Sequence, residues 1–262
     1  VQYISEKYPK KVQWNIKKLQ IYTIDIEVSA EDGFPNIQSA ASDVTAITVP
    51  DSIEDVYHVW GTGGYIPHDQ TKNILYYECD DEDELIENFL QWWENNYPHI
   101  ITGWNCKFFD IPYLINRIKY LDKKPARLSP IGLINDRNVF IAGKENQYYT
   151  IFGISTLDYI DLYKKFTYKI RESYRLDYIG SVELGLKKLE VGDVHGYDLY
   201  KTNYQKFIEY NIRDVEIVEK LEEKMKLLEL VITLAYESKI NFEDVFSPVR
   251  TWDAIIYNFL KK

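Results

Sequence analysis

The residues of this 262-residue chain best suited to do chemistry are acids that lie far apart in the sequence. Asp25 and Glu27 stand two residues apart in Ile21–Val28, a β-branched, alternating segment that predicts a strand. Both carboxylates should therefore project from one face of the strand, while Ile24 and Ile26 occupy the other. Hard divalent cations such as Mg²⁺ and Mn²⁺ prefer oxygen ligands of this kind. A polar strand face exposed to solvent is the alternative interpretation of the pair.

A third acid, Asp110, stands where a predicted buried strand (His99–Trp104) gives way to a helix expected over Ile111–Tyr120. The residues from Trp104 to Asp110 are rich in aromatics and suit a cleft that receives a base or a sugar. Asp is also a favoured helix N-cap, so capping is the alternative role for this residue. In the same stretch Cys106 is expected to pack in the core, because no His lies near it in sequence.

The fourth acid, Asp214, lies in a long predicted helix, four residues after Tyr210 and therefore on the same face. It follows Phe207 by seven residues and precedes Val218 by four, which are spacings of the apolar stripe. The carboxylate should point inward with that stripe and needs a partner there. A metal ion is one such partner, and a structural ion pair with Lys or Arg is the alternative.

Acids spread over so much of the chain are the pattern expected of a two-metal site that assembles on folding. The four histidines (His58, His68, His99 and His195) show no metal or triad spacing. Gly61-Thr62-Gly63-Gly64 lacks a following Lys-Ser/Thr and predicts a loop rather than a phosphate cradle.

The elements that must position these acids alternate between strands and helices, which predicts a single α/β domain with a partly antiparallel sheet. The expected strands are Ile21–Val28, Asp43–Pro50, Asp55–Trp60, Asn73–Tyr77, His99–Trp104 and Ser155–Leu162, with a hairpin of Asn138–Ile141 and Gln147–Phe152. The expected helices begin near Asp80–Asp83, cover Ile111–Tyr120, lie within Leu176–Leu186 and run from Asn203 to about Leu230.

Composition excludes several classes of protein. Hydrophobic residues make up 45% of the chain, enough for a full core, but no run approaches a membrane helix and nothing resembles a secretion signal. Cys79 and Cys106 alone cannot build a disulfide scaffold, and a reducing cytoplasmic setting fits best. The net charge of −10 argues mildly against a protein that binds nucleic acid by bulk charge, but it is compatible with an acidic nuclease in which bound metal ions supply the positive charge.

The residues singled out above resemble a known family. Asp25-Ile26-Glu27, Asn105-Cys106-Lys107-Phe108-Phe109-Asp110 and Tyr210-Asn211-Ile212-Arg213-Asp214 resemble, in order and spacing, the three exonuclease motifs of family B DNA polymerases. Longer stretches resemble the replicative polymerases of T-even-type tailed phages: Ile101–Asn105, Ser129–Gly132, Leu157–Phe166 and Thr251–Ile256. The resemblance implies a ribonuclease H-like fold with a mixed sheet flanked by helices, and proofreading 3′→5′ hydrolysis of DNA with two Mg²⁺ or Mn²⁺ ions.

The resemblance also implies roles for individual residues. The four metal-site carboxylates correspond to Asp25, Glu27, Asp110 and Asp214, and Tyr210 corresponds to the tyrosine that orients the attacking water. Lys188 aligns with a lysine that the phage enzymes bring to the site, with a surface lysine as the alternative. The hairpin around Gly143 resembles the strand-separating hairpin of the family. DNA contacts are expected from Phe34, Asn105 and Phe108.

The chain departs from the family in lacking the polymerase half, and it begins at Val1 without an initiator Met. We expect residues 1–20 to be a lead-in segment left from an N-terminal region and residues 21–262 to be the exonuclease domain. The expected partners are a single-stranded DNA 3′ end and the polymerase portion of the same or a separate chain, with no membrane. Alternative functions are a non-catalytic DNA-holding or docking module of a split polymerase and a ribonuclease of the same fold. If the source is a phage, the expected place of action is the cytoplasm of an infected bacterium.

Overall fold

The computed structural model describes residues 2–8, 13–30, 33, 35–69, 71–141, 143–186 and 196–260. Within these residues the centre of the fold is a seven-stranded sheet in the order β5-β4-β3-β1-β6-β9, with β2 also paired to β3. The strands of this sheet are β1 (Ile21–Thr23), β2 (Asp25–Val28), β3 (Val44–Asp51), β4 (Val56–Gly61), β5 (Ile74–Glu78), β6 (Ile100–Thr102) and β9 (Ser155–Thr156).

The sheet is mixed, as the sequence predicted. Strand β3 runs antiparallel to β1, β2 and β4, whereas β1 pairs with β6, β6 with β9 and β4 with β5 in parallel. The expected α/β class with a partly antiparallel sheet is confirmed. The middle strands are buried on both faces, since every residue of β3 is buried.

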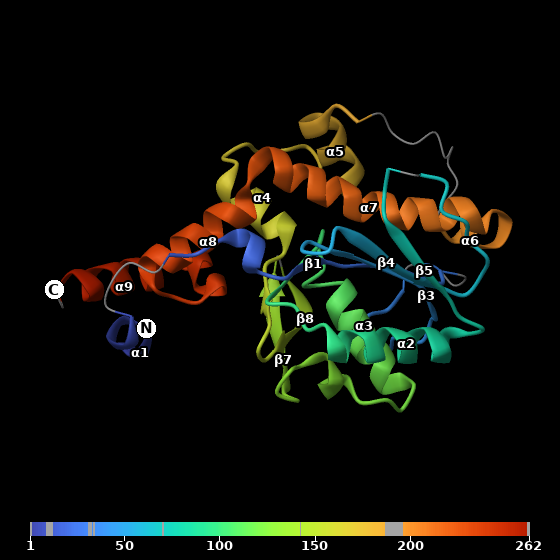
Figure 1. The fold of residues 1–262 in the computed structure, drawn as a ribbon, viewed down its shortest axis with the longest axis horizontal. Coiled ribbons are helices and arrows are strands. Elements are labelled where there is room, and N and C mark those ends of the chain that lie inside the picture. The colour runs from blue at the N-terminus through green and yellow to red at the C-terminus, as the bar shows by residue number, and fades with distance from the viewer. Residues whose placement is uncertain are drawn as a thin grey trace.

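Helices cover both faces of the sheet. The long helix α7 crosses one face, while α2 and α3 lie against the other (Figure 1). Helices α8 and α9 continue beyond the sheet toward α1 at one end of the molecule (Figure 1). No helix in the described ranges is long and apolar enough to cross a membrane. The helices are α1 (Gln2–Lys7), α2 (Glu82–Asn95), α3 (Asp110–Tyr120), α4 (Tyr159–Phe166), α5 (Leu176–Leu184), α6 (Gly196–Thr202), α7 (Tyr204–Met225), α8 (Leu227–Ser238) and α9 (Pro248–Leu260), with 3₁₀ turns at Ile16–Lys18, Pro125–Leu128 and Phe242–Phe246.

The strand predicted over residues 21–28 is divided in two at Ile24. The N–H of Ile24 donates to the carbonyl of Thr102 at 2.9 Å, which ends the run that pairs with β6. The chain then continues as β2, whose one partner strand among the described residues is β3. This change of partner places Asp25 and Glu27 opposite β3, on the part of the sheet that α7 covers.

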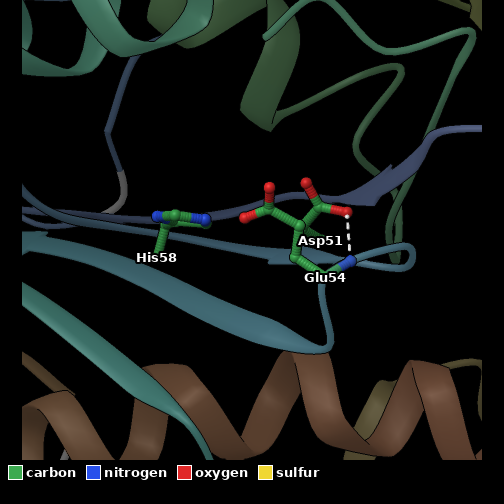
Figure 2. Close-up of side chains that lie close together, drawn as sticks. All are labelled: Asp51, Glu54 and His58. Carbon is green, nitrogen blue, oxygen red and sulfur yellow. Dashed lines mark hydrogen bonds between the residues drawn. The ribbon is translucent and has the colours of Figure 1, made fainter.

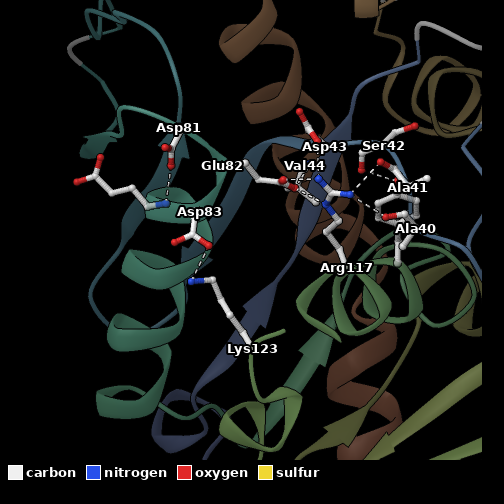
Figure 3. A network of polar contacts seen from close by, with 12 residues as sticks. Ala40, Ala41, Ser42, Asp43, Val44, Asp81, Glu82, Asp83, Arg117 and Lys123 are labelled. Atoms are coloured by element: carbon white, nitrogen blue, oxygen red, sulfur yellow. Dashed lines mark hydrogen bonds and ion pairs between the residues drawn. The ribbon is translucent and has the colours of Figure 1, made fainter. Parts of the chain in front are cut away.

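A buried arginine fixes the start of β3 to both helices of the opposite face (Figure 3). Nε of Arg117 in α3 donates to the carboxylate of Glu82 in α2 at 2.7 Å, and Nη1 donates to the carbonyls of Ala40 and Ala41 at 3.0 and 2.9 Å. The same Glu82 carboxylate accepts the N–H of Val44 at 2.6 Å. Burying the guanidinium requires such a complete set of partners, so α2, α3 and β3 are held in a fixed relation.

Two expectations about secondary structure were wrong. Ser155–Leu162 is not one strand, because only Ser155–Thr156 pairs with β6 and helix α4 begins at Tyr159. The side chain of Asp158 caps that helix by accepting the N–H of Ile160 at 3.1 Å. The helix predicted from Asn203 to about Leu230 is interrupted at Lys226, which has the left-handed φ of 54°. There the Glu222 carboxylate accepts the first free N–H groups of α8, from Leu228 and Glu229.

The predicted hairpin is present, but it is longer than expected and its turn is tighter. Strand β7 (Ile134–Ile141) pairs with β8 (Lys144–Ile151), and the register places Ile141 opposite Lys144. The loop therefore holds two residues instead of the five predicted. Gly143 supplies the positive φ of 79° that such a turn requires, which Gly adopts without steric cost.

Candidate active site

The two acids of β2 share one face of the strand, as their spacing predicted. Asp25 and Glu27 are half-buried, whereas Ile24 and Ile26 are 2% and 4% exposed and belong to the core on the other side. Asp25 pairs with Thr48 of β3, and the register shifts between Glu27 and Val28. The solvent-exposed polar face considered as the alternative is therefore not what the structure shows, because both carboxylates lie beneath α7.

Asp110 is the first residue of α3 and does not cap it. The N-cap is Phe109, which makes no side-chain capping bond. The Asp110 carboxylate instead accepts the N–H of Ile26 through Oδ1 at 3.0 Å and is 3% exposed. Because Ile26 stands between the two acids of β2, this bond holds Asp110 beside them, and the capping alternative is not supported.

Helix α7 brings the last two predicted residues to the same place. Tyr210 and Asp214 lie one helical turn apart, and the side chain of Tyr210 hydrogen-bonds to the Asp214 carboxylate. Carboxylate oxygens of Asp25, Glu27 and Asp214 all lie within 4.8 Å of one another. Asp110 is outside that group but close enough that its charge acts on both Asp25 and Glu27. We define these four carboxylates as the acidic site.

Asn211, which stands next to Tyr210 in α7, is a site residue that the sequence pattern did not predict. Its Nδ2 donates to Oδ2 of Asp25 at 2.5 Å, and its Oδ1 accepts the hydroxyl of Thr48 in β3. Asn211 is fully buried and shares the apolar stripe of α7 with Phe207 and Val215. A polar residue at stripe spacing was the signal that could have identified it, since a buried amide needs partners.

The pKa values of the acidic site are raised, because burial and mutual repulsion disfavour the charged forms. Burial first, and then the charges of the other members of the site, hold the pKa of Asp25 well above its usual range. Burial raises the pKa of Glu27 to about 8, and the charges of Asp214 and Asp110 add to that shift. Burial likewise raises the pKa values of Asp110 and Asp214 to about 7. Divalent cations would relieve this crowding and keep all four groups ionised.

The loop before Asp110 carries an aromatic surface next to the acidic site. Phe108 packs edge-to-face on Tyr148 of β8 at 6.2 Å, and Nζ of Lys107 lies 5.2 Å from both ring centroids. Asn105 is exposed and has a positive φ of 68°. The Asp158 carboxylate holds this loop by accepting the N–H groups of Asn105 and Lys107 at 3.0 and 2.9 Å.

Of the other three residues considered, the structure describes Cys106 but not Phe34 or Lys188. Cys106 is fully buried, and burial raises the pKa of its thiol, so its packing role is confirmed. Phe34 and Lys188 lie outside the described residues, and their roles stay predictions.

Comparison with known proteins identifies the family. The family model of the DNA polymerase family B exonuclease domain matches residues 2–179. The DNA-directed DNA polymerase of Escherichia phage RB69 is 38% identical over 290 aligned residues, covering 99% of this chain and 32% of the phage protein. The DNA-directed DNA polymerase of Enterobacteria phage T4 is 33% identical over 285 residues, covering 99% of this chain and 31% of the phage protein.

Another relative is similar over a shorter stretch of the chain. DNA polymerase 1 of Sulfurisphaera ohwakuensis is 31% identical over 179 residues, which cover 67% of this chain and 19% of that protein. The chain spans about a third of the length of the two phage relatives. It belongs to the exonuclease-domain family of family B DNA polymerases, whose ribonuclease H-like fold and metal-dependent nuclease activity agree with the mixed α/β fold and the acidic site.

Proposed function

We propose that this domain is a proofreading 3′→5′ exonuclease, which hydrolyses terminal nucleotides from single-stranded or frayed DNA with two divalent metal ions. The observation that carries the proposal is the convergence of Asp25, Glu27 and Asp214, whose oxygens lie within 4.8 Å of one another. These residues come from β2 and α7, which are remote along the chain, and Asp110 from α3 adjoins them.

The acidic site fits two Mg²⁺ or Mn²⁺ ions, because all its donors are carboxylate oxygens and their pKa values are raised by crowding. Asp25, Glu27 and Asp214 would hold one ion, and Asp25 with Asp110 would hold the second. When bound, such ions supply a water of lowered pKa and stabilise the negative charge on the departing 3′-oxygen.

The protein groups around the ions would hold the reacting atoms in place. The charge of Asp214, and then burial, raise the pKa of Tyr210, so its hydroxyl stays protonated and can orient the attacking water. Glu27 would accept a hydrogen bond from the same water. Asn211 fixes the orientation of Asp25 through the 2.5 Å bond to Oδ2. We also propose that Lys188 contributes to this site, and the support for this is its resemblance to the lysine that the phage enzymes bring there.

The surface next to the acidic site suits a single strand. A terminal base must unpair to reach carboxylates that lie beneath α7, so frayed or single-stranded ends should react fastest. Phe108, half-buried beside Tyr148, offers a ring on which a base can stack. We propose that Asn105 contacts the sugar–phosphate chain and that Phe34 stacks on a base near the cleaved end.

The partner that we propose is the polymerase portion of the same or a separate chain, because the phage relatives are DNA-directed DNA polymerases about three times as long as this domain. Their sources also support action in the cytoplasm of an infected bacterium.

A 5′-labelled oligonucleotide tests the direction, the substrate and the metal together. We expect Mg²⁺ to produce a ladder of products shortened from the 3′ end, EDTA to stop it, and single-stranded DNA to be cut faster than blunt duplex or matched RNA. RNA degraded at least as fast as DNA would assign a ribonuclease. Retention of DNA with no metal-dependent shortening would assign a strand-holding module instead.

A further inference from the structure

A second group of ligand-type side chains lies on the opposite face of the sheet from the acidic site. Asp51 ends β3, Glu54 lies in the turn that follows, and His58 stands in β4. Asp25 and His58 pair with adjacent residues of β3, so their side chains leave the sheet on opposite faces. Figure 2 shows the three side chains together on one side of the strands. Sequence spacing gave no sign of this group, because the β3–β4 turn assembles it.

One buried nitrogen of this group, Nε2 of His58, lacks a hydrogen-bond partner among the described residues. The other ring nitrogen, Nδ1, lies 3.0 Å from the hydroxyl of Tyr77. His58 is buried, with only 4% of the residue exposed, and Trp92 packs against its ring at 4.5 Å. The ring points toward the carboxylates of the turn (Figure 2). A buried nitrogen without a partner costs free energy, which a ligand at that atom would remove.

The positions of the donor atoms suit a small cation. Donor atoms of Asp51, Glu54 and His58 all lie within 4.8 Å of one another. In a tetrahedral site with bonds of about 2.0–2.2 Å, neighbouring donors stand roughly 3.3–3.6 Å apart, so donors separated by as much as 4.8 Å would have to move closer together. Glu54 can supply this movement, because it is exposed and lies in the turn.

Asp51 is already oriented for such a role. Oδ1 accepts the N–H groups of Ile53 and Glu54 at 2.8 and 3.2 Å, and Oδ2 accepts Nε2 of Gln20 at 3.0 Å. Oδ2 also accepts the hydroxyl of Tyr22, at 3.3 Å, which is long for an O–H···O bond. A cation at Oδ2 would replace this weak contact, and the remaining contacts would hold the carboxylate in place.

We propose that Asp51, Glu54 and His58 form a transition-metal site, with Zn²⁺ as the expected ion, separate from the acidic site. An imidazole nitrogen with two carboxylates suits Zn²⁺, whereas Mg²⁺ and Ca²⁺ prefer oxygen donors alone. A bound ion would join the β3–β4 turn to His58 in the sheet and stabilise that hairpin. It would take no part in hydrolysis, because the acidic site lies across the sheet.

The test uses tag-free protein carrying Asp25→Asn and Asp214→Asn, which removes ligands of the acidic site. Calorimetric titration with ZnCl₂ should show one ion bound per chain, and thermal unfolding should show a higher Tm with Zn²⁺ but not with Mg²⁺. Adding Glu54→Gln or His58→Gln should weaken Zn²⁺ binding by about tenfold or more. His68→Ala, which removes an exposed histidine outside the group, should leave the affinity unchanged.

The exposed position of Glu54 keeps the test decisive, because Glu54→Gln should fold even if the substitution of buried His58 does not. The proposal is overturned if the parent variant binds no Zn²⁺, or if Glu54→Gln binds it as tightly as the parent. Nuclease activity of the otherwise native protein should be the same with and without Glu54→Gln, so the result does not depend on the proposed hydrolysis.

Discussion

Asn211 donates a hydrogen bond of 2.5 Å to Asp25, although the two residues are 186 positions apart. The same amide accepts the hydroxyl of Thr48, so it connects α7 to two neighbouring strands of the sheet. The bond lowers the pKa of Asp25, but burial and the nearby carboxylates outweigh it. Helix α7 thus contributes one acid of the site through Asp214 and aligns another through Asn211.

Asn211→Ala should therefore reduce nuclease activity without replacing any carboxylate. Residues that orient metal ligands typically change affinity or activity by about 10–100-fold, and we expect a loss in that range. Steady-state rates on single-stranded DNA across a Mg²⁺ titration measure it, and Thr48→Val serves as the control with a smaller loss. A variant that matches the wild-type rate and metal dependence would show that the bond has no role in positioning Asp25.

Tyr210→Phe removes one hydroxyl and keeps the ring. If that hydroxyl orients the attacking water, the rate at saturating DNA should fall by about 10–100-fold while the Mg²⁺-dependent rise in Tm persists. Tyr236→Phe is the matched control, because Tyr236 lies in α8 and stacks on Trp14. Equal rates for the two variants would argue against the assignment of Tyr210.

Stability of the metal-free protein should depend on pH through the acidic site. The folded-state pKa values of Glu27 and Asp214 are about 8 and 7, above the unfolded values of about 4. The folded state then binds protons more tightly, so stability is highest near pH 4 for these groups and is lost as pH rises to about 8. We expect a loss of several kcal/mol, since each pKa unit corresponds to about 1.4 kcal/mol.

Urea unfolding in EDTA at pH 5.5 and about 8 checks this expectation against the Asp25→Asn, Asp214→Asn variant. The variant should lose less stability over that interval than the wild type, because two of the repelling charges are gone. The same pH dependence in both proteins would mean that other buried groups, such as Asp158 with a pKa of about 7, dominate instead.

Mg²⁺ or Mn²⁺ should raise the melting temperature of the wild-type protein. A ligand present at about 100 times its Kd stabilises the folded state by about 2.7 kcal/mol, which for a domain of this size is a shift of about 5–10 °C. Differential scanning calorimetry with Mg²⁺ and with EDTA measures the shift, and it should vanish in Asp25→Asn, Asp214→Asn. An unchanged wild-type midpoint at saturating metal would count against a preformed site.

Much of the acidic site could be predicted because it rests on simple periodicities. Alternation along β2 placed Asp25 and Glu27 on one face, and the apolar stripe of α7 placed Asp214 inward. Local sequence could not decide between capping and site roles for Asp110, because Asp suits both. In the structure the Asp110 carboxylate accepts the N–H of Ile26 at 3.0 Å, and this long-range hydrogen bond places Asp110 beside Asp25 and Glu27 rather than in a capping role.

The parts that sequence did not predict depend on long-range contacts or on single backbone angles. The end of α7 rests on the left-handed conformation of Lys226 and on Glu222 accepting N–H groups of α8, while the apolar pattern continues through the break. Asp51, Glu54 and His58 are close in sequence, but their spacing matches no recognised metal motif, and only the β3–β4 turn shows that their side chains meet. Such features follow from tertiary structure and leave no periodic signal.

The most direct test of the account compares hydrolysis by the wild type with that by Asp25→Asn, Asp110→Asn and Asp214→Asn, each shown to be folded by circular dichroism. On single-stranded DNA with saturating Mg²⁺, we expect each variant to lose about a thousandfold or more in rate, because every carboxylate is needed to seat the ions. A folded variant that shortens DNA from the 3′ end at the wild-type rate would contradict the assignment of the acidic site as the catalytic centre.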